Sequence, residues 1–357
     1  MNINSKKWML GLLAIALIIL CALASVIIYI DPYFHYHKPL ASLYYELDNE
    51  RSQNDGIIRH FDYDSMIIGT SMAENFKTSE AEGLFGGSFI KVPFAGGTYK
   101  EQNDNIAKAI KYNPNLKTVI RPLDYAYIMD DKDRVRNDLG SYPDYLYDNN
   151  PFNDVKYVFN KQILFDICLP MLDGARAGRT GGATSFDDYA NWMADVEFGA
   201  NVVLADRTEY KEPEQIQPYV DEIEKLVHDN ITQNVVELAK ANPDVQFYYY
   251  LTPYSVAWWG SQMELGTVER WIAAEEYAIT LMLECDNIHL YSFNNEFDIT
   301  TNLDNYSDEC HHGDWINSQI LGWLYSGTDK LTKENYEEYI SVEKEFYVNY
   351  DYSSLLD

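Results

Sequence analysis

Three residues in two distant stretches could together perform nucleophilic chemistry. Ser71 follows a short apolar run in MIIGTSMAENF, and Asp308 and His311 lie three residues apart in NYSDECHHGDWIN. At this spacing the carboxylate can accept a hydrogen bond from the imidazole Nδ1–H, which leaves the other ring nitrogen free to take a proton from a hydroxyl. The pattern favours Ser71 as nucleophile, His311 as base and Asp308 as the residue that orients the base.

Ser71 also has a purely structural interpretation. Serine is a preferred helix N-cap, and Glu74 stands three residues further on, as in a capping box. Taken alone, this stretch favours the cap. The Asp308–His311 pair changes the balance, because both stretches follow predicted strands and are expected to meet at one edge of a sheet.

A metal phosphodiesterase site is an alternative for the second stretch. Its candidate ligands are Asp308, His311, His312 and Asp314. Such a site needs further ligands, and the sequence contains neither a CxxC pair nor a second cluster of ligands. We therefore expect no metal and no other cofactor.

Short apolar strands alternate with amphipathic helices along most of the chain. The strands are predicted at 65–68, 88–97, 116–125, 245–255 and 288–293, and the helices near Glu74, over 101–114, 219–241 and 267–285, and after His312. This alternation predicts an α/β fold, a doubly wound (flavodoxin-like), mostly parallel five-stranded sheet with helices on both faces. Ligands bind beyond the carboxyl ends of such strands, so residues that follow strands are the site candidates.

The N-terminal segment differs from the rest of the chain. Lys6 and Lys7 precede an uncharged stretch from Trp8 to Ile30, which is long enough to span a bilayer core of about 30 Å. A signal peptide usually has an apolar region of only about 7–15 residues, so we favour an uncleaved anchor. The two lysines should stay in the cytoplasm, which predicts a single-pass cell-membrane protein with its main domain outside.

The charge of the exterior part restricts its partners. The chain has a net charge of −29, and removing the two positive charges of Lys6 and Lys7 leaves −31 outside. Such a surface repels phosphate backbones, which argues against nucleic acid and fits neutral or cationic substrates such as glycans. Acidity that merely keeps an exported protein soluble is the simpler explanation. Three cysteines lie outside, and a bridge between Cys285 and Cys310 is left open, as is the state of Cys168.

The sequence divides into four predicted parts. They are a cytoplasmic tip and anchor (1–30), a juxtamembrane neck (31–59), an α/β domain (60–327) with an insertion at about 130–218, and an acidic aromatic C-terminal tail (328–357). The insertion lacks the strand–helix alternation, which predicts a wall or lid over the site. Trp258 and Trp259, just past the fourth strand, are the aromatic pair expected at the cleft.

Three short motifs, IIGTSM, VPFAGGTY and DECHHGDWIN, resemble those of the SGNH (GDSL-type) hydrolase family. The resemblance covers most of residues 60–325 and is greatest to membrane-anchored bacterial cell-envelope members, including the protein that serves D-alanylation of teichoic acids. It implies an SGNH-hydrolase-like fold with Ser71 as nucleophile and Asp308 and His311 completing a triad. The N–H of Ser71 and that of Gly96 or Gly97 would form an oxyanion hole.

The chain departs from the family at the third motif. The family commonly has G-x-N-D, whereas the third strand here ends RPLDY, with Asp124 but no asparagine. A carboxylate cannot donate a hydrogen bond to an oxyanion unless it is protonated. Asp124 could instead orient Tyr125, Arg121 or a substrate hydroxyl, or be an exposed acid at the end of a strand.

The resemblance implies an extracytoplasmic esterase or O-acyltransferase that acts on acyl esters of a cell-envelope polysaccharide or teichoic-type polymer. The alternative is a weakly active or inactive relative that binds a glycan or a membrane-bound O-acyltransferase. An α/β-hydrolase is less compatible with the sequence, because in that fold several strands normally precede the serine, and here only one does.

Overall fold

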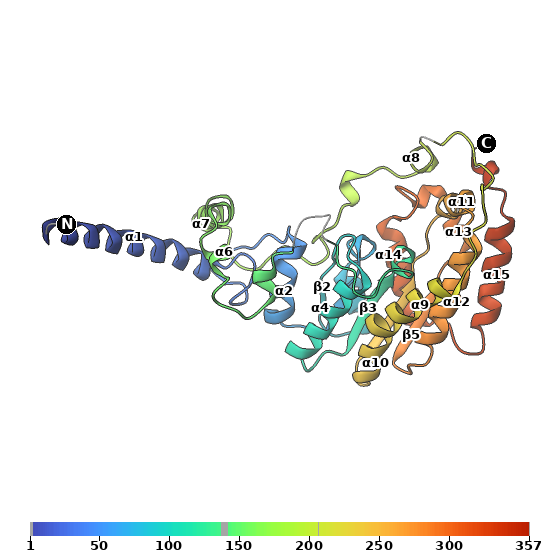
Figure 1. Ribbon diagram of the computed structural model, residues 1–357, viewed down its shortest axis with the longest axis horizontal. Helices are drawn as coiled ribbons and strands as arrows, with labels where there is room; N and C mark the ends of the chain where they lie inside the picture. The colour runs from blue at the N-terminus through green and yellow to red at the C-terminus, as the bar shows by residue number, and fades with distance from the viewer. Residues whose placement is uncertain (1–2, 137–141, 206, 357) are drawn as a thin grey trace. The chain divides into compact units, whose positions relative to one another are not determined.

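The computed structural model describes residues 3–136, 142–205 and 207–356 (Figure 1). Four segments of the predicted parts lie outside the described residues: 1–2 of the tip, 137–141 and 206 of the insertion, and 357 of the tail. The chain divides into two compact units. The N-terminal unit comprises the described parts of 1–61 and 138–185, and the sheet unit comprises those of 62–137 and 186–357.

The sheet unit is built on five parallel strands in the order β2-β1-β3-β4-β5. The strands are β1 (Ser65–Ile67), β2 (Phe89–Lys91), β3 (Thr118–Leu123), β4 (Gln246–Leu251) and β5 (Ile288–Ser292). The structure thus confirms the predicted doubly wound α/β sheet. From β1 the chain adds β2 on one side of the sheet and then adds β3, β4 and β5 on the other side. Ligands bind at this change of side, between the carboxyl ends of β1 and β3, in folds of this kind.

Both faces of the sheet are covered by helices, as the near-continuous apolar strands require. On one face Ile120 of β3 belongs to an apolar cluster with residues of α3 (Thr78–Phe85) and α14 (Asp314–Ser326). The next residue, Arg121, points to the other face and binds Gln102 of α4 (Tyr99–Tyr112) through its Nε, at 2.8 Å.

The other helices of the sheet unit connect or flank the strands. They are α8 (Ala200–Val203), α9 (Asp221–Ile231), α10 (Glu237–Ala241), α11 (Val256–Glu264), α12 (Val268–Met282), α13 (Phe297–Thr300) and α15 (Tyr336–Asn349). The helix predicted over 219–241 is α9 and α10, joined by the π-helical turn η5 (Thr232–Val236). Of this helical segment, α9 packs against α12, and η5 packs against both α4 and α12.

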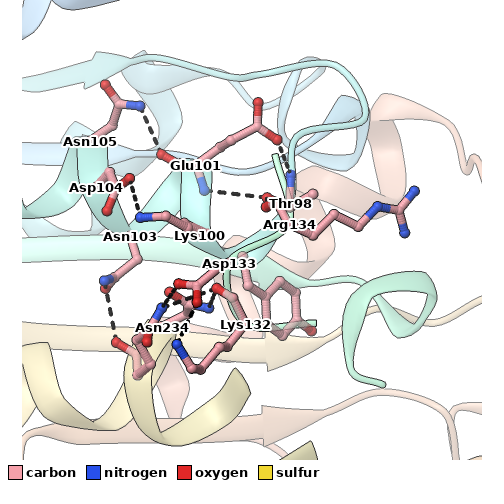
Figure 2. A network of polar contacts seen from close by, with 12 residues as sticks. Thr98, Lys100, Glu101, Asn103, Asp104, Asn105, Lys132, Asp133, Arg134 and Asn234 are labelled. Atoms are coloured by element: carbon pink, nitrogen blue, oxygen red, sulfur yellow. Dashed lines mark hydrogen bonds and ion pairs between the residues drawn. The ribbon is translucent and has the colours of Figure 1, made fainter. Parts of the chain in front are cut away.

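A capping box fixes the loop that leads from β2 into α4. The Thr98 side chain accepts a hydrogen bond from the Glu101 N–H, and the Glu101 carboxylate accepts one from the Thr98 N–H at 2.8 Å (Figure 2). The Thr98 hydroxyl also donates to the Arg134 carbonyl at 2.6 Å. Nearby, Asn234 of η5 donates to the Lys132 carbonyl (Figure 2). The loop before α4 is therefore held from both sides.

Helix α15 brings a carboxylate into the core of the sheet unit. Glu343 of α15 and Glu275 of α12 are both fully buried beside the Tyr125 hydroxyl, which donates to Glu275. Asn294 donates to Glu343 at 3.2 Å and also contacts Tyr125. Burial raises the pKa of Glu275 to about 7, and burial and the neighbouring carboxylate raise that of Glu343 well above its usual range. The two acids therefore share a proton near neutral pH.

The N-terminal unit begins with α1 (Ile3–Ile30), of which Ser5–Ile30 is long and apolar enough to cross a membrane. Its other elements are α2 (Glu50–His60), α5 (Asp144–Tyr147), α6 (Val155–Val158), the π-helical turn η3 (Ile163–Cys168) and α7 (Leu169–Arg176). Asp31 ends α1 with a positive φ of 47°, and its buried carboxylate accepts from the backbone N–H groups of Tyr36 and His37.

The four cysteines are free thiols. The bridge considered between Cys285 and Cys310 is not formed. Burial raises the pKa of the Cys168 thiol to about 12 and also raises that of Cys285, which disfavours the reactive thiolate at both.

Candidate active site

Ser71 stands in a sharp turn directly past β1. Gly69 is required there, because a Cβ at this position would lie 2.6 Å from Cγ of Pro122. Thr70 then caps the 3₁₀ turn η1 (Ser71–Ala73), its hydroxyl accepting from the Met72 N–H at 3.2 Å. The interpretation of Ser71 as the helix cap is therefore wrong: Thr70 takes that role and leaves the Ser71 hydroxyl for another partner.

That partner is His311. The Ser71 Oγ lies 2.7 Å from His311 Nε2, and His311 Nδ1 lies 2.6 Å from the Asp308 carboxylate Oδ2. The structure thus brings together residues that are 240 positions apart in the chain. The distances suit proton transfer from the hydroxyl to the imidazole, with the carboxylate holding the proton on Nδ1.

A compact turn gives Asp308 its orientation. Its Oδ1 accepts from the backbone N–H groups of Cys310 and His311 at 2.7 and 2.8 Å, so Oδ2 is left to face the imidazole. The turn is attached to the segment after β4, where the Ser255 N–H donates to the Glu309 carbonyl at 3.0 Å. Tyr306 donates from its hydroxyl to the Pro253 carbonyl at 2.7 Å. The sheet therefore determines where His311 lies.

The charges of the pair support a basic His311. Partial burial raises the pKa of Asp308, but the hydrogen bond and charge of His311 and two backbone N–H groups outweigh it and lower this pKa to about 2. Burial lowers the pKa of His311, whereas the hydrogen bond and charge of Asp308 raise it, with a net rise above the usual value. Asp308 is thus ionised at all physiological pH values, and its charge favours the protonated, cationic form of His311.

The glycine loop after β2 lies beside the turn of Ser71. The Phe94 N–H donates to the Gly69 carbonyl at 2.8 Å, and Gly96 has a positive φ of 61°. The Gly97 N–H donates to the Phe94 carbonyl at 2.6 Å, so it is not available for an oxyanion. Among the described residues, the N–H groups of Gly96 and Ser71 have no backbone carbonyl as acceptor. Of the two predicted glycines, Gly96 is the one left for that role.

Asp124 is not the exposed acid that was one of the interpretations considered for it. It is 2% exposed, so it is not an exposed strand end, and its carboxylate accepts from the hydroxyls of Thr70 at 2.7 Å and Tyr254 at 2.9 Å. Burial raises its pKa, and these two hydrogen bonds partly offset the rise. Thr70 precedes Ser71 and caps the turn η1, and its hydroxyl donates to Asp124. Asp124 therefore positions the Ser71 turn through Thr70.

Aromatic residues that the sequence did not single out lie beside His311. The centroid of the Trp192 ring lies 5.7 Å from that of the His311 imidazole, in an edge-to-face contact. The ring of Phe198 is stacked on Trp192 with a centroid distance of 6.5 Å, and the Trp315 ring of α14 lies 5.0 Å from Phe198, centroid to centroid. Trp192 and Phe198 come from the predicted insertion, and the Trp192 N–H is held by Asn75 at 3.2 Å. We call Trp192, Phe198 and Trp315 the aromatic wall.

The expected pair, Trp258 and Trp259, does not lie at the cleft. Both are buried, and Trp259 stacks at 4.4 Å on Tyr347 of α15. No pattern in the local sequence distinguishes these core tryptophans from Trp192, because all of them occur in aromatic, loop-flanked stretches.

The four residues considered for a metal point in different directions. His311 faces Ser71 and Asp308 faces His311, as described above. The buried His312 makes a ring-nitrogen contact with the Gly313 carbonyl at 3.3 Å, and Asp314 pairs with Lys77 at 2.8 Å. Burial lowers the pKa of His312 to about 4. Within the described ranges, no group of three or more His, Cys, Asp or Glu side chains is arranged to hold a metal ion.

Comparison with known proteins adds little to this geometry. No family model and no curated protein matches the chain. A solved structure from Streptococcus pneumonia, described provisionally as a platelet activating factor, is 10% identical, covers 78% of this chain and 90% of its own, and has a TM-score of 0.36. This distant likeness assigns neither a substrate nor a set of site residues.

Proposed function

We propose that this chain is an extracytoplasmic serine esterase or O-acyltransferase that acts on acyl esters of a cell-envelope or exported polysaccharide or teichoic-type polymer. The observation that carries the proposal is the continuous hydrogen-bonded series Ser71–His311–Asp308 at the carboxyl edge of the sheet. The motif resemblance to SGNH hydrolases supports the same chemistry, with Ser71 in the position of the nucleophile.

In the proposed reaction, His311 Nε2 takes the Ser71 proton as Oγ attacks the acyl carbonyl. The carbonyl oxygen becomes an oxyanion, for which the N–H groups of Ser71 and Gly96 are the candidate donors. His311 then gives its proton to the leaving alcohol, and an acyl-enzyme forms. Water or a sugar hydroxyl, deprotonated by His311, attacks this ester, and His311 returns the proton to Ser71 Oγ as the acyl group leaves it. Water as acceptor gives an esterase, and a sugar hydroxyl gives an acyltransferase.

The site offers fewer oxyanion donors than the family pattern. The third motif, RPLDY, has no asparagine to act as the amide donor, and its Asp124 carboxylate accepts hydrogen bonds from Thr70 and Tyr254. Loss of one oxyanion donor typically lowers turnover by about 10²–10³-fold. We therefore expect slow turnover, as suits modification of a polymer more than bulk hydrolysis.

Two further features fit a neutral polymer outside the cell. Lys6 and Lys7 before the apolar part of α1 favour a cytoplasmic N-terminus, which would place the site outside. The aromatic wall beside His311 offers ring faces that can pack on the apolar faces of sugars, and Trp315 is 43% exposed. The strong negative charge of the chain favours a polysaccharide over a phosphate-bearing teichoic-type polymer as the substrate.

A fluorophosphonate probe tests the proposal without knowledge of the substrate. The full-length protein should become covalently labelled, and Ser71→Ala should not be. Ser326→Ala, an exposed serine of α14, is the matched control and should label like the wild type. Labelling that persists in Ser71→Ala would assign the reactive serine elsewhere and would contradict the proposal.

The second candidate is a weakly active or inactive module that binds a glycan or a membrane-bound O-acyltransferase. The observation that favours it is the third motif, RPLDY, which has no asparagine donor and whose Asp124 is buried and accepts hydrogen bonds within the fold. Absence of labelling across a range of roughly pH 6 to 9, in protein with a cooperative unfolding transition, would support this candidate over the enzyme.

A further inference from the structure

The N-terminal unit has an apolar surface that its own core does not cover. Five large apolar side chains of residues 152–169, which run from just before α6 to the start of α7, are exposed, and we call them the apolar platform. They are Phe152, Val155, Phe159, Phe165 and Leu169. Several large apolar side chains exposed within one short segment are a candidate surface for contact with a partner or a membrane.

The platform lies on the outer side of elements that are packed only on their inner side. In η3, Ile163, Leu164 and Cys168 are buried, whereas Phe165 and Leu169, four residues apart, are 61% and 39% exposed. Helix α7 has no buried residue, although its first half reads LPML. The apolar character of this outer side therefore does not come from packing within the unit.

Both η3 and α6 pack against α1, and the burial pattern of α1 shows where. Residues from Ser5 to Leu23 are exposed, and burial begins only at Ala24. Ile27 and Ile30 in the last turns are 1% and 0% exposed. The platform elements therefore contact the final turns of the membrane-crossing helix (Figure 1).

The length of α1 gives the depth of those turns in a bilayer. A hydrocarbon core of about 30 Å takes about 20 helical residues, so a span that begins at Trp8 ends near Ile27. Trp8 and Tyr29 are both exposed and lie about 32 Å apart along the helix, as aromatic residues at the two interfaces do. The last turns of α1, and hence η3 and α6, then lie at the level of the lipid headgroups.

Buried hydrogen bonds hold the platform at this level. The Tyr157 hydroxyl of α6 donates to the Asp31 carboxylate at 2.8 Å, and the Tyr45 hydroxyl donates to the Ile30 carbonyl at 2.6 Å. Both contacts join the rest of the N-terminal unit to the C-terminal end of α1. The unit therefore cannot move away from the membrane surface unless these contacts break.

We propose that the apolar platform lies in the headgroup region of the bilayer leaflet that holds the C-terminal end of α1, where its side chains contact lipid and not water. The occupant is the lipid bilayer, because η3 and α6, which carry part of the platform, pack against the last turns of a helix long and apolar enough to cross it. Exposed Lys156 and Lys161 flank the platform and can reach lipid phosphates while their stems stay apolar. The membrane thus contacts the unit along a surface as well as through one helix.

Depth-dependent quenching in liposomes tests this proposal. The full-length protein carries Cys21→Ser and Cys310→Ser, and a bimane dye is attached to a single added cysteine at Phe165 or Leu169. Lipids with a nitroxide near the headgroup should quench both labels at least half as strongly as a label at Tyr29→Cys. The glutathione adduct of the dye gives the aqueous limit. Labels at this limit, with Tyr29→Cys quenched, would leave the platform to water or a protein partner and overturn the proposal.

A second variant separates contact from mere proximity. Phe165→Asp combined with Leu169→Asp should lower the quenching of a label at Val155→Cys at least twofold. Both replaced side chains are exposed, so the thermal unfolding temperature should change little. Quenching that is unchanged by the two charges would contradict a platform in lipid. Fluorophosphonate labelling of Ser71 does not enter this test, so its outcome is independent of the proposed function.

Discussion

Asp308→Asn should remove almost all reactivity of Ser71 and leave the fold intact. Asp308 Oδ1 accepts from the N–H groups of Cys310 and His311, and these donors fix which atom of an asparagine lies there. The amide oxygen must take this place, so the amide NH₂ faces His311 Nδ1 and donates to it. The imidazole proton then moves to Nε2, which can no longer accept the proton of Ser71.

The size of the effect follows from this change of tautomer. The wrong tautomer in a triad of this kind lowers turnover by about 10⁴-fold, which corresponds to about 5.5 kcal/mol in the barrier. The two backbone hydrogen bonds survive and the side chain is about half exposed, so we expect the free energy of unfolding to change by less than about 1 kcal/mol. The loss would thus be chemical and not structural.

The assay is the second-order rate constant of fluorophosphonate labelling, measured with urea unfolding of the same preparations. Asp304→Asn makes the same chemical change on an exposed acid of the same loop and should label at the wild-type rate. A rate for Asp308→Asn within tenfold of the wild type, in folded protein, would refute the assignment of Asp308 as the residue that orients His311.

Three other predictions concern charge inside the sheet unit. Labelling of the wild type should rise with pH and reach half its maximum above pH 6.5, because Asp308 raises the pKa of His311 and only neutral His311 can act as base; a midpoint below this value would contradict the ion pair. Asp124→Ala should cost about 2–4 kcal/mol in urea unfolding and slow labelling at least tenfold, because it leaves the buried hydroxyls of Thr70 and Tyr254 without their acceptor; unchanged stability and rate would remove its positioning role. Glu343→Gln should raise the thermal unfolding temperature more at pH 8 than at pH 5. The pKa of Glu343 is higher in the folded protein than in the unfolded chain, where it is near 4.5, so the stability it contributes below pH 4.5 is lost as the pH rises through the folded-state pKa. Glutamine does not ionise and therefore avoids this loss. An equal change at both pH values would mean that Glu343 does not take up the proton.

Local patterns in the sequence were sufficient to predict much of the architecture. The strand at 65–68, the helix at 101–114 and the apolar segment from Trp8 to Ile30 each follow from periodicity within a few residues, and the parallel sheet follows from their alternation. The Asp308–His311 spacing likewise sets a short-range geometry that the turn reproduces. These features could be predicted because neighbouring residues in the chain decide them.

Contacts between distant segments decided the remainder. Whether Thr70 or Ser71 caps η1 depends on Asp124, which draws the Thr70 hydroxyl from 54 residues away. The burial of Trp259 depends on α15, and the contact of Trp192 with His311 depends on how the predicted insertion folds back. In each case the side chain's type was visible in the sequence. Its partner was not, because long-range packing and the satisfaction of buried polar groups select among conformations that are locally almost equal.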